Sequence, residues 1–252
     1  MLDYFSSLAT HAVGCALAYG ATAWLCLGPW ACARDSHFAE VVQRYRLDPN
    51  HTPSAQTLGR EARFGLLSIA VLTAWDVLIR SDGAGRIMGW STAQSLALNL
   101  PPPSPGRGSL MALALGAILI GDTHFFWTHR LLHVVPWLYR NVHKTHHLSA
   151  SPNPLSGLSF HPLESLLYFS SLPLTALLLP LPPAVYATYK WSLLLAPILT
   201  HCGLGVTHGP LAVLTHDHHV HHRLGVVNFG GLLPWDVLCG TDYAAWRRKN
   251  GR

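Results

Sequence analysis

Histidines are concentrated in one part of this 252-residue chain, and their spacing constrains how the chain can fold. Fourteen of the seventeen histidines lie between His124 and His222. Residues three or four apart share one face of a helix, so a cluster with that spacing can direct two or three imidazoles at one point. Three such clusters occur: His129 with His133; His143 with His146 and His147; and His218 with His221 and His222.

The three clusters predict a metal-dependent enzyme. Imidazole is a common ligand of iron, zinc, copper and nickel. Eight histidines are too many for one tetrahedral zinc ion but suit two metal ions side by side. In the second cluster, the i, i+3 and i+4 positions give two ligands for one metal and a third for its neighbour, and the third cluster repeats this spacing. His216 and His219 leave another register of the third cluster open.

Further candidates lie beside the clusters. His124, His161 and His201 are candidate ligands, with a hydrogen-bonded role next to the metals as the alternative. His124 lies about 140° around a helix from His129, so it needs a bend or the second metal to contribute. An all-imidazole site has no charged ligand, so carboxylates are expected to orient the ring N–H groups. The carboxylates placed for this, with ordinary caps and turns as the alternative, are Asp122, Glu164, Asp217 and Asp236.

The composition indicates a membrane protein. Half of the residues are hydrophobic and 12% are charged, whereas a soluble domain has about a quarter of its residues charged. The net charge is +5, but the basic residues are dispersed, and a nucleic-acid partner would need a clustered basic face. The five cysteines include no C-x2-C pair, so neither a disulfide framework nor a thiolate zinc site is expected.

Apolar runs predict an all-α, multi-pass bundle of about four to five membrane helices with a cytosolic histidine-rich cap. The runs are residues 8–30, 64–79, 110–129, 162–179 and 184–200. Prolines between 180 and 183 join the last two runs as a hairpin, which places His161 and His201 at its two feet on the side of the clusters. We expect N-terminal membrane helices over 1–109, a catalytic domain over 110–243 and a basic tail over 244–252.

The distribution of basic residues predicts the orientation. With the clusters placed in the cytosol, thirteen Lys and Arg residues lie inside and three outside. The positive-inside rule therefore favours a cytosolic catalytic face.

The motif order resembles the fatty acid hydroxylase/sterol desaturase superfamily over about residues 121–243. The motifs are the three histidine clusters, 160–164 (FHPLE), 201–204 (HCGL), 228–230 (NFG) and the W-D-x3-G-T-D run of 235–242. The resemblance implies an integral membrane oxidase of lipids that uses O2 and two iron ions. It matches the clusters to three histidine boxes and His201 to a further family histidine. Gly205 stands where many members have a second histidine, so the ligand set of the second iron stays open.

Within this resemblance, the residues 159–164 favour a sterol substrate, with hydroxylation or desaturation both open. The alternatives are a sphingoid-base or fatty-acid hydroxylase and a carotenoid-ring hydroxylase. Other classes are a zinc transporter, a metalloprotease, which would need the missing H-E-x-x-H, and a catalytically silent scaffold. We expect an external electron donor, which the resemblance implies is cytochrome b5 with its reductase, or a ferredoxin. The expected location is the endoplasmic reticulum in a eukaryote or the inner membrane in a bacterium.

Overall fold

The computed structural model describes residues 10, 13–21, 45–80, 106–205 and 210–251. Within these ranges the chain is helical and has no strand beyond one isolated bridge between Arg46 and Leu204. The predicted all-α fold is therefore confirmed. Most of the predicted run at 8–30 and the loop at 81–105 lie outside the described residues.

The long helices are α3 (Ala55–Arg80), α6 (Arg107–Val134), α11 (Pro183–Thr200) and α12 (Pro210–Leu224). The shorter ones are α7 (Pro136–Leu138), the π-helix η1 (Tyr139–His143), α8 (Lys144–His147), the 3-10 helix η2 (Pro154–Leu158), α9 (Pro162–Phe169), α10 (Ser171–Leu178), α13 (Trp235–Cys239) and α14 (Tyr243–Asn250). Within the described part of the chain, two helices are long and apolar enough to cross a membrane, Ala55–Ile79 and Gly108–Val134.

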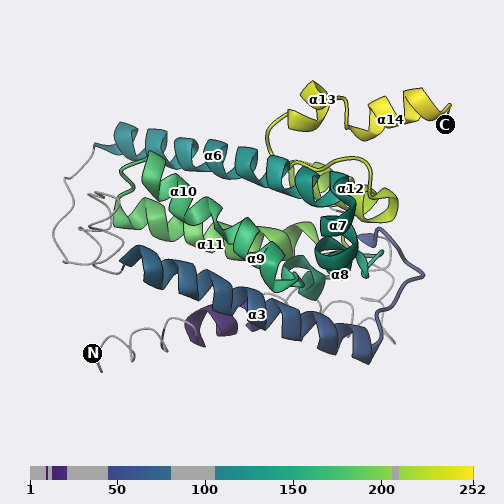
Figure 1. The fold of residues 1–252 in the computed structure, drawn as a ribbon, viewed down its shortest axis with the longest axis horizontal. Helices are drawn as coiled ribbons and strands as arrows, with labels where there is room; N and C mark the ends of the chain where they lie inside the picture. The colour runs from purple at the N-terminus through teal and green to yellow at the C-terminus, as the bar shows by residue number, and fades with distance from the viewer. Residues whose placement is uncertain (1–9, 11–12, 22–44, 81–105, 206–209, 252) are drawn as a thin grey trace.

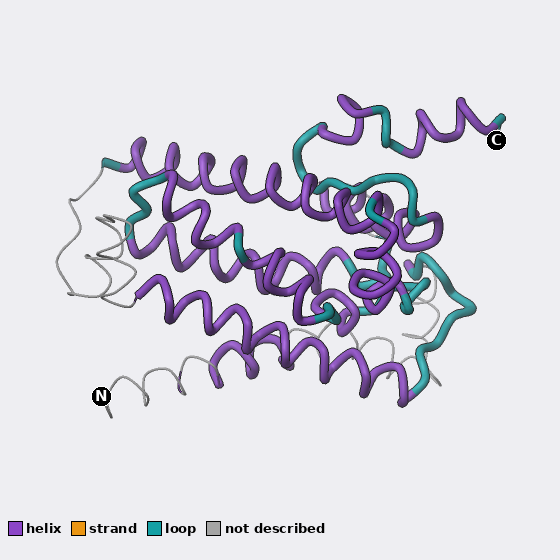
Figure 2. The backbone as a smooth tube through the Cα atoms, in the orientation of Figure 1, coloured by secondary structure: helices purple, strands orange, loops and turns teal. Residues whose placement is uncertain are grey.

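The two long apolar helices enclose the predicted hairpin. In Figure 1, α9, α10 and α11 lie between α3 and α6, and α7, α8 and α12 gather at one end. Figure 2 shows the loops at the two ends of this bundle. Helix α11 returns the chain after the turn at 179–182, so His201 lies at the end that holds the histidine clusters. The helices α13 and α14 lie outside the bundle, beyond α6 and α12 (Figure 1).

The first arm of the hairpin is two helices where the sequence suggested one apolar run. Ser170 separates α9 from α10. Pro173 has no N–H to donate to the carbonyl of Phe169, so the ladder of backbone hydrogen bonds is interrupted there. The break directs α9 towards α3 and α10 towards α6.

Polar contacts inside the bundle fix the helices that carry the site. Ser68 of α3 donates to the Leu158 carbonyl over 2.8 Å and lies 2.8 Å from the Ser165 hydroxyl of α9. Asp76, unusual in an apolar run, accepts from the Tyr186 hydroxyl at 2.6 Å and from Lys190 at 3.3 Å. A buried carboxylate is stable only when it is paired and hydrogen-bonded, so these contacts set how α3 packs on α11.

Candidate metal centre

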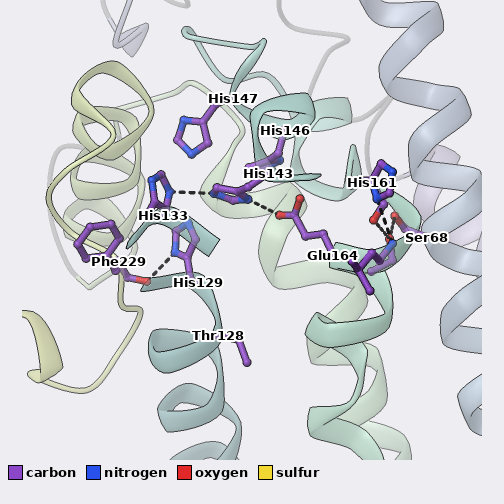
Figure 3. Close-up of polar contacts among 12 residues, drawn as sticks. Ser68, Thr128, His129, His133, His143, His146, His147, His161, Glu164 and Phe229 are labelled. Carbon is purple, nitrogen blue, oxygen red and sulfur yellow. Dashed lines mark hydrogen bonds and ion pairs between the residues drawn. The ribbon is translucent and has the colours of Figure 1, made fainter. Parts of the chain in front are cut away.

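Nine histidines meet in two adjacent groups at the end of the bundle. Their ligand nitrogens lie within 4.8 Å of one another in each group. That is the scale of ligands around one ion with metal–nitrogen bonds of about 2 Å. The first group is His129, His133, His143, His147 and His221; the second is His146, His201, His218 and His222. Figure 3 shows most of the first group, with His129 and His133 on α6 facing His143.

Helical spacing divides the second and third clusters between the two groups. His143 and His147, four residues apart, join the first group, and His146 joins the second. In α12 the division is reversed: His218 and His222 join the second group, and His221 joins the first. Each motif therefore supplies two nitrogens to one group and one to the other, as the spacing predicts.

The turn after α6 brings the second cluster back onto the first. Val135 is extended, with φ −91° and ψ 109°, and Pro136 begins α7. A residue before proline is disfavoured in the helical region, so α6 ends there. The π-helix η1 then leads into α8, and the Nε2 atom of His143 lies 2.8 Å from the Nε2 atom of His133.

The second group shows most directly that a cation suits this centre. His201 Nδ1 lies 2.7 Å from the Pro197 carbonyl, and His222 Nδ1 lies 3.0 Å from the Ser149 carbonyl. A carbonyl only accepts, so both Nδ1 atoms carry the proton and both Nε2 atoms of the neutral rings present lone pairs. Those two Nε2 atoms are 3.1 Å apart. Facing lone pairs repel unless a positive ion lies between them, so the donor set fits a metal.

Burial keeps these imidazoles neutral. Desolvation lowers the pKa of His146, His218 and His222 well below the ordinary value, and the neighbouring imidazoles lower it further. Desolvation also lowers the pKa of His143 and His221 well below the ordinary value. A metal binds only the neutral ring, so burial holds the ligands in their binding form at neutral pH.

The four predicted carboxylates have different surroundings. Glu164 Oε1 lies 2.7 Å from His143 Nδ1, and Figure 3 marks this contact with a dashed line. Asp236 accepts from the backbone N–H groups of Phe229 and Gly230 at 2.9 and 2.7 Å. Because the Phe229 carbonyl accepts from His129 Nδ1 at 2.7 Å, Asp236 holds the loop that orients His129. Asp122 accepts from Leu232 and Leu233 N–H groups in the same loop, whereas Asp217 lies 3.6 Å from the half-exposed His216.

Two predicted ligands lie outside both groups. His124 Nε2 is 3.0 Å from the Ser170 hydroxyl. His161 is the N-cap of α9, and its Nδ1 accepts from the Leu163 N–H at 3.2 Å. His216 and His219 are also outside the groups. The structure therefore places His201 in the second group, whereas His124 of α6 and His161 at the start of α9 lie outside both groups.

Sequence reasoning missed the carbonyls that orient the rings. Those of Ser149, Pro197 and Val227 accept from His222, His201 and His221. Every residue has a carbonyl, so no side-chain pattern marks them.

An apolar cavity of about 330 Å³ reaches the centre from inside the bundle. Histidines of both groups line one end of it, namely His129, His143, His146, His201 and His218. From there it extends along α6 as far as Ile118 and along α11 as far as Tyr189. Cavities of this size accommodate small organic ligands, so an apolar molecule could lie with one end against the histidines.

Comparison with known proteins identifies the family. A family model described as fatty acid hydroxylase matches residues 114–241, half of the chain. The chain therefore belongs to the fatty acid hydroxylase family.

Similar proteins include cholesterol 25-hydroxylase of Mus musculus, which is 29% identical over 212 residues, 80% of this chain and 66% of that protein. Methylsterol monooxygenase 2-2 of Arabidopsis thaliana is 33% identical over 159 residues, 58% of each chain. Sphinganine C4-monooxygenase 2 of the same plant is 30% identical over 156 residues, 54% of this chain and 56% of that protein. The chain thus covers 56 to 66% of the length of these relatives. No solved structure matches it.

Proposed function

We propose that this chain is a membrane-bound, di-iron, O2-dependent lipid hydroxylase or desaturase that acts on a sterol. The observation that carries the proposal is the pair of histidine groups at one end of an apolar cavity. Two iron ions, when bound, would activate O2 for attack on an unactivated C–H bond. The similarity to cholesterol 25-hydroxylase, which covers more of this chain than the sphinganine relative does, favours a sterol.

The chain's own residues bind and orient. The first iron would be held by His129, His133, His143, His147 and His221, and the second by His146, His201, His218 and His222. Backbone carbonyls and Glu164 fix the ring orientations. The apolar walls of the cavity exclude water from the oxidised carbon, which limits side reactions. This ligand set omits His124 and His161, whose ring nitrogens contact Ser170 and Leu163 instead.

We propose that α3, α6 and the hairpin lie in the membrane with the histidine groups on the cytosolic side. The catalytic domain would span 110–243, and lipid would enter the cavity from the bilayer. Electrons would come from a separate donor, either cytochrome b5 with its reductase or a ferredoxin. The membrane would be the endoplasmic reticulum in a eukaryotic host and the inner membrane in a bacterial one.

The deciding experiment is metal analysis combined with turnover. Protein produced with ample iron should contain two irons per chain and consume O2 when given cholesterol and a reductant, with an oxidised sterol as product. Sphinganine supplied in parallel tests the alternative substrate class. One metal per chain, or iron-loaded protein without lipid-dependent O2 consumption, contradicts the proposal.

A further inference from the structure

The end of the cavity away from the histidines contains buried hydroxyl groups. Ser171 and Tyr189 line the cavity there, and their side chains are 1% and 6% exposed. The hydroxyls of Ser171 and Thr175 lie beside that of Tyr189. Apart from their contacts with one another, none of the three oxygens has a hydrogen-bond partner among the described residues. Each hydroxyl can donate one hydrogen bond and accept two, so a buried cluster whose only partners are its own members favours an occupant that bonds to it.

The position of these hydroxyls relative to the histidines follows from the helices. A methyl group on Gly121 of α6 would overlap the Tyr189 hydroxyl, so that hydroxyl lies against the α6 backbone at Gly121. Eight residues of helix separate Gly121 from His129, which corresponds to about 12 Å. Along α11, twelve residues separate Tyr189 from His201, or about 18 Å. The cavity connects the two ends past apolar side chains such as Phe125 and Leu193.

One more unpaired atom lines the same cavity. Ser170 donates its hydroxyl proton to the Leu167 carbonyl at 2.7 Å. It must then accept from His124 Nε2, which lies 3.0 Å away. His124 Nδ1 is therefore a lone-pair acceptor, and it is buried without a partner among the described residues. The cavity thus offers hydroxyl groups that both donate and accept, and a ring nitrogen that only accepts.

The charge of the cavity selects a neutral polar group. Among its described lining residues there is no Lys or Arg, and Asp122 and Glu164 are both present. At the hydroxyl end, a phosphate or carboxylate headgroup would have no Lys or Arg to pair with and would lie near Asp122, which is unfavourable in an apolar site. A lipid hydroxyl can donate one hydrogen bond and accept two.

We infer that Ser171 and Tyr189 bind the hydroxyl of a lipid alcohol, so that the carbon oxidised at the histidine groups lies about 12–18 Å from that hydroxyl. This inference rests on the proposed function, because it gives that site's substrate class and the position of attack. The lipid alcohol is held by its oxygen at one end of the cavity and is oxidised at the end that the histidines line. The same arrangement excludes oxidation next to the hydroxyl-bearing carbon.

Binding by matched lipid pairs tests the inference. Iron-loaded full-length protein in detergent would be titrated with tritiated cholesterol and tritiated octadecan-1-ol, each competed by its deoxy partner, cholest-5-ene or octadecane. At least one alcohol should bind about tenfold more tightly than its deoxy partner, the effect of one to two hydrogen bonds. The double variant Ser171→Ala/Tyr189→Phe should lose this preference and keep its affinity for the deoxy lipid. No saturable binding of either alcohol, or no preference for the alcohol, overturns the inference.

Ser192→Ala is the matched control. Ser192 lines the same cavity, but its hydroxyl already donates to the Tyr189 carbonyl at 2.7 Å, so its loss should leave the preference intact. The iron content of every variant should equal that of the unmodified protein, since none of these hydroxyls contacts the histidine groups. A preference retained by the double variant contradicts the inference.

Product analysis separates this inference from the proposed function. If the protein binds iron and oxidises a lipid alcohol, mass spectrometry should find the new oxygen or double bond remote from the original hydroxyl. A product modified beside that hydroxyl overturns the inference and leaves the proposed function intact. An alcohol preference in a protein that holds no iron and consumes no O2 contradicts the proposed function alone.

Discussion

The imidazole rings of the two histidine groups are oriented by different contacts. In the first group, Glu164 places a carboxylate 2.7 Å from His143, and two further rings donate to the carbonyls of Phe229 and Val227. In the second group, His201 and His222 donate to the carbonyls of Pro197 and Ser149, and His201 Nδ1 also lies 3.3 Å from the Thr200 hydroxyl. All four histidines of the second group are buried, whereas His133 and His147 of the first are half-buried.

The difference shows two ways of stabilising a cation among neutral ligands. A carboxylate bonded to a ligating histidine raises the basicity of the ring and would supply negative charge close to a metal held by the first group. The second group has His201 as the C-cap of α11, an 18-residue helix. The carbonyl end of a helix has a partial negative charge, which favours a cation there. The first group therefore combines one carboxylate with backbone carbonyls, whereas the second relies mainly on backbone carbonyls.

The largest expected effect is the loss of a direct ligand from either group. His221→Ala removes a ligand from the first group and His146→Ala one from the second. Each variant should lose activity by more than about 100-fold, because partners that only orient a ligand already contribute about 10–100-fold. Lipid-dependent O2 consumption measures the effect, and metal analysis should show about one iron lost in each variant. Full activity in either variant contradicts the ligand assignment.

Glu164→Gln should affect the first group alone. The amide keeps the size of the side chain but removes its charge, so His143 loses basicity while its position is maintained. We expect metal affinity of the first site to fall by about 10–100-fold. Titration with a chelator should then remove one iron at a lower chelator concentration than the other. Equal release of both irons would show that the carboxylate does not distinguish the two sites.

The spacing of the second cluster was enough to predict that its three histidines divide two and one between adjacent groups, because residues four apart share one face of a helix. The roles of His161 and His201 were not decided in this way. Both lie at the feet of the hairpin, but only His201 reaches the second group. Pro162 begins α9, which leaves His161 as its N-cap; that cap–proline signal was present in the sequence.

The orienting contacts depend on tertiary packing and had only a partial signal. Glu164 and Asp236 were predicted near the ligands, yet Asp236 acts through the backbone of Phe229 and Gly230. The Ser149 carbonyl accepts from His222, which is 73 positions away in the sequence. A local sequence pattern cannot predict a contact of this kind. The break of the hairpin arm at Ser170 was also missed, although Pro173 is its cause.

Glu61→Gln should affect the second group, and less strongly. Glu61 is fully buried in α3 and accepts from the Ser149 hydroxyl and, at 2.8 Å, from Asn153. It therefore holds the loop whose Ser149 carbonyl orients His222. Because Glu61 acts two contacts away from the metal, we expect a several-fold loss of affinity at the second site, below the roughly 10–100-fold loss of a direct partner. The same chelator titration should release the iron that Glu164→Gln leaves firmly bound. Release of the same iron in both variants would contradict the separate support of the two sites.

The smallest expected effect concerns the crowded third cluster. His216 and His218 are two residues apart on α12, so they point in different directions. His218 is buried in the second group, whereas the His216 side chain is 58% exposed and lies 3.6 Å from Asp217. Exposed ion pairs contribute little to stability, so His216→Ala should keep two irons, and its activity should remain within about twofold of the unmodified protein, as expected for a surface substitution. His218→Ala is the matched variant and should lose one iron and its activity. If His216→Ala loses iron while His218→Ala retains it, the third cluster has the other register, and the assignment of the second site is wrong.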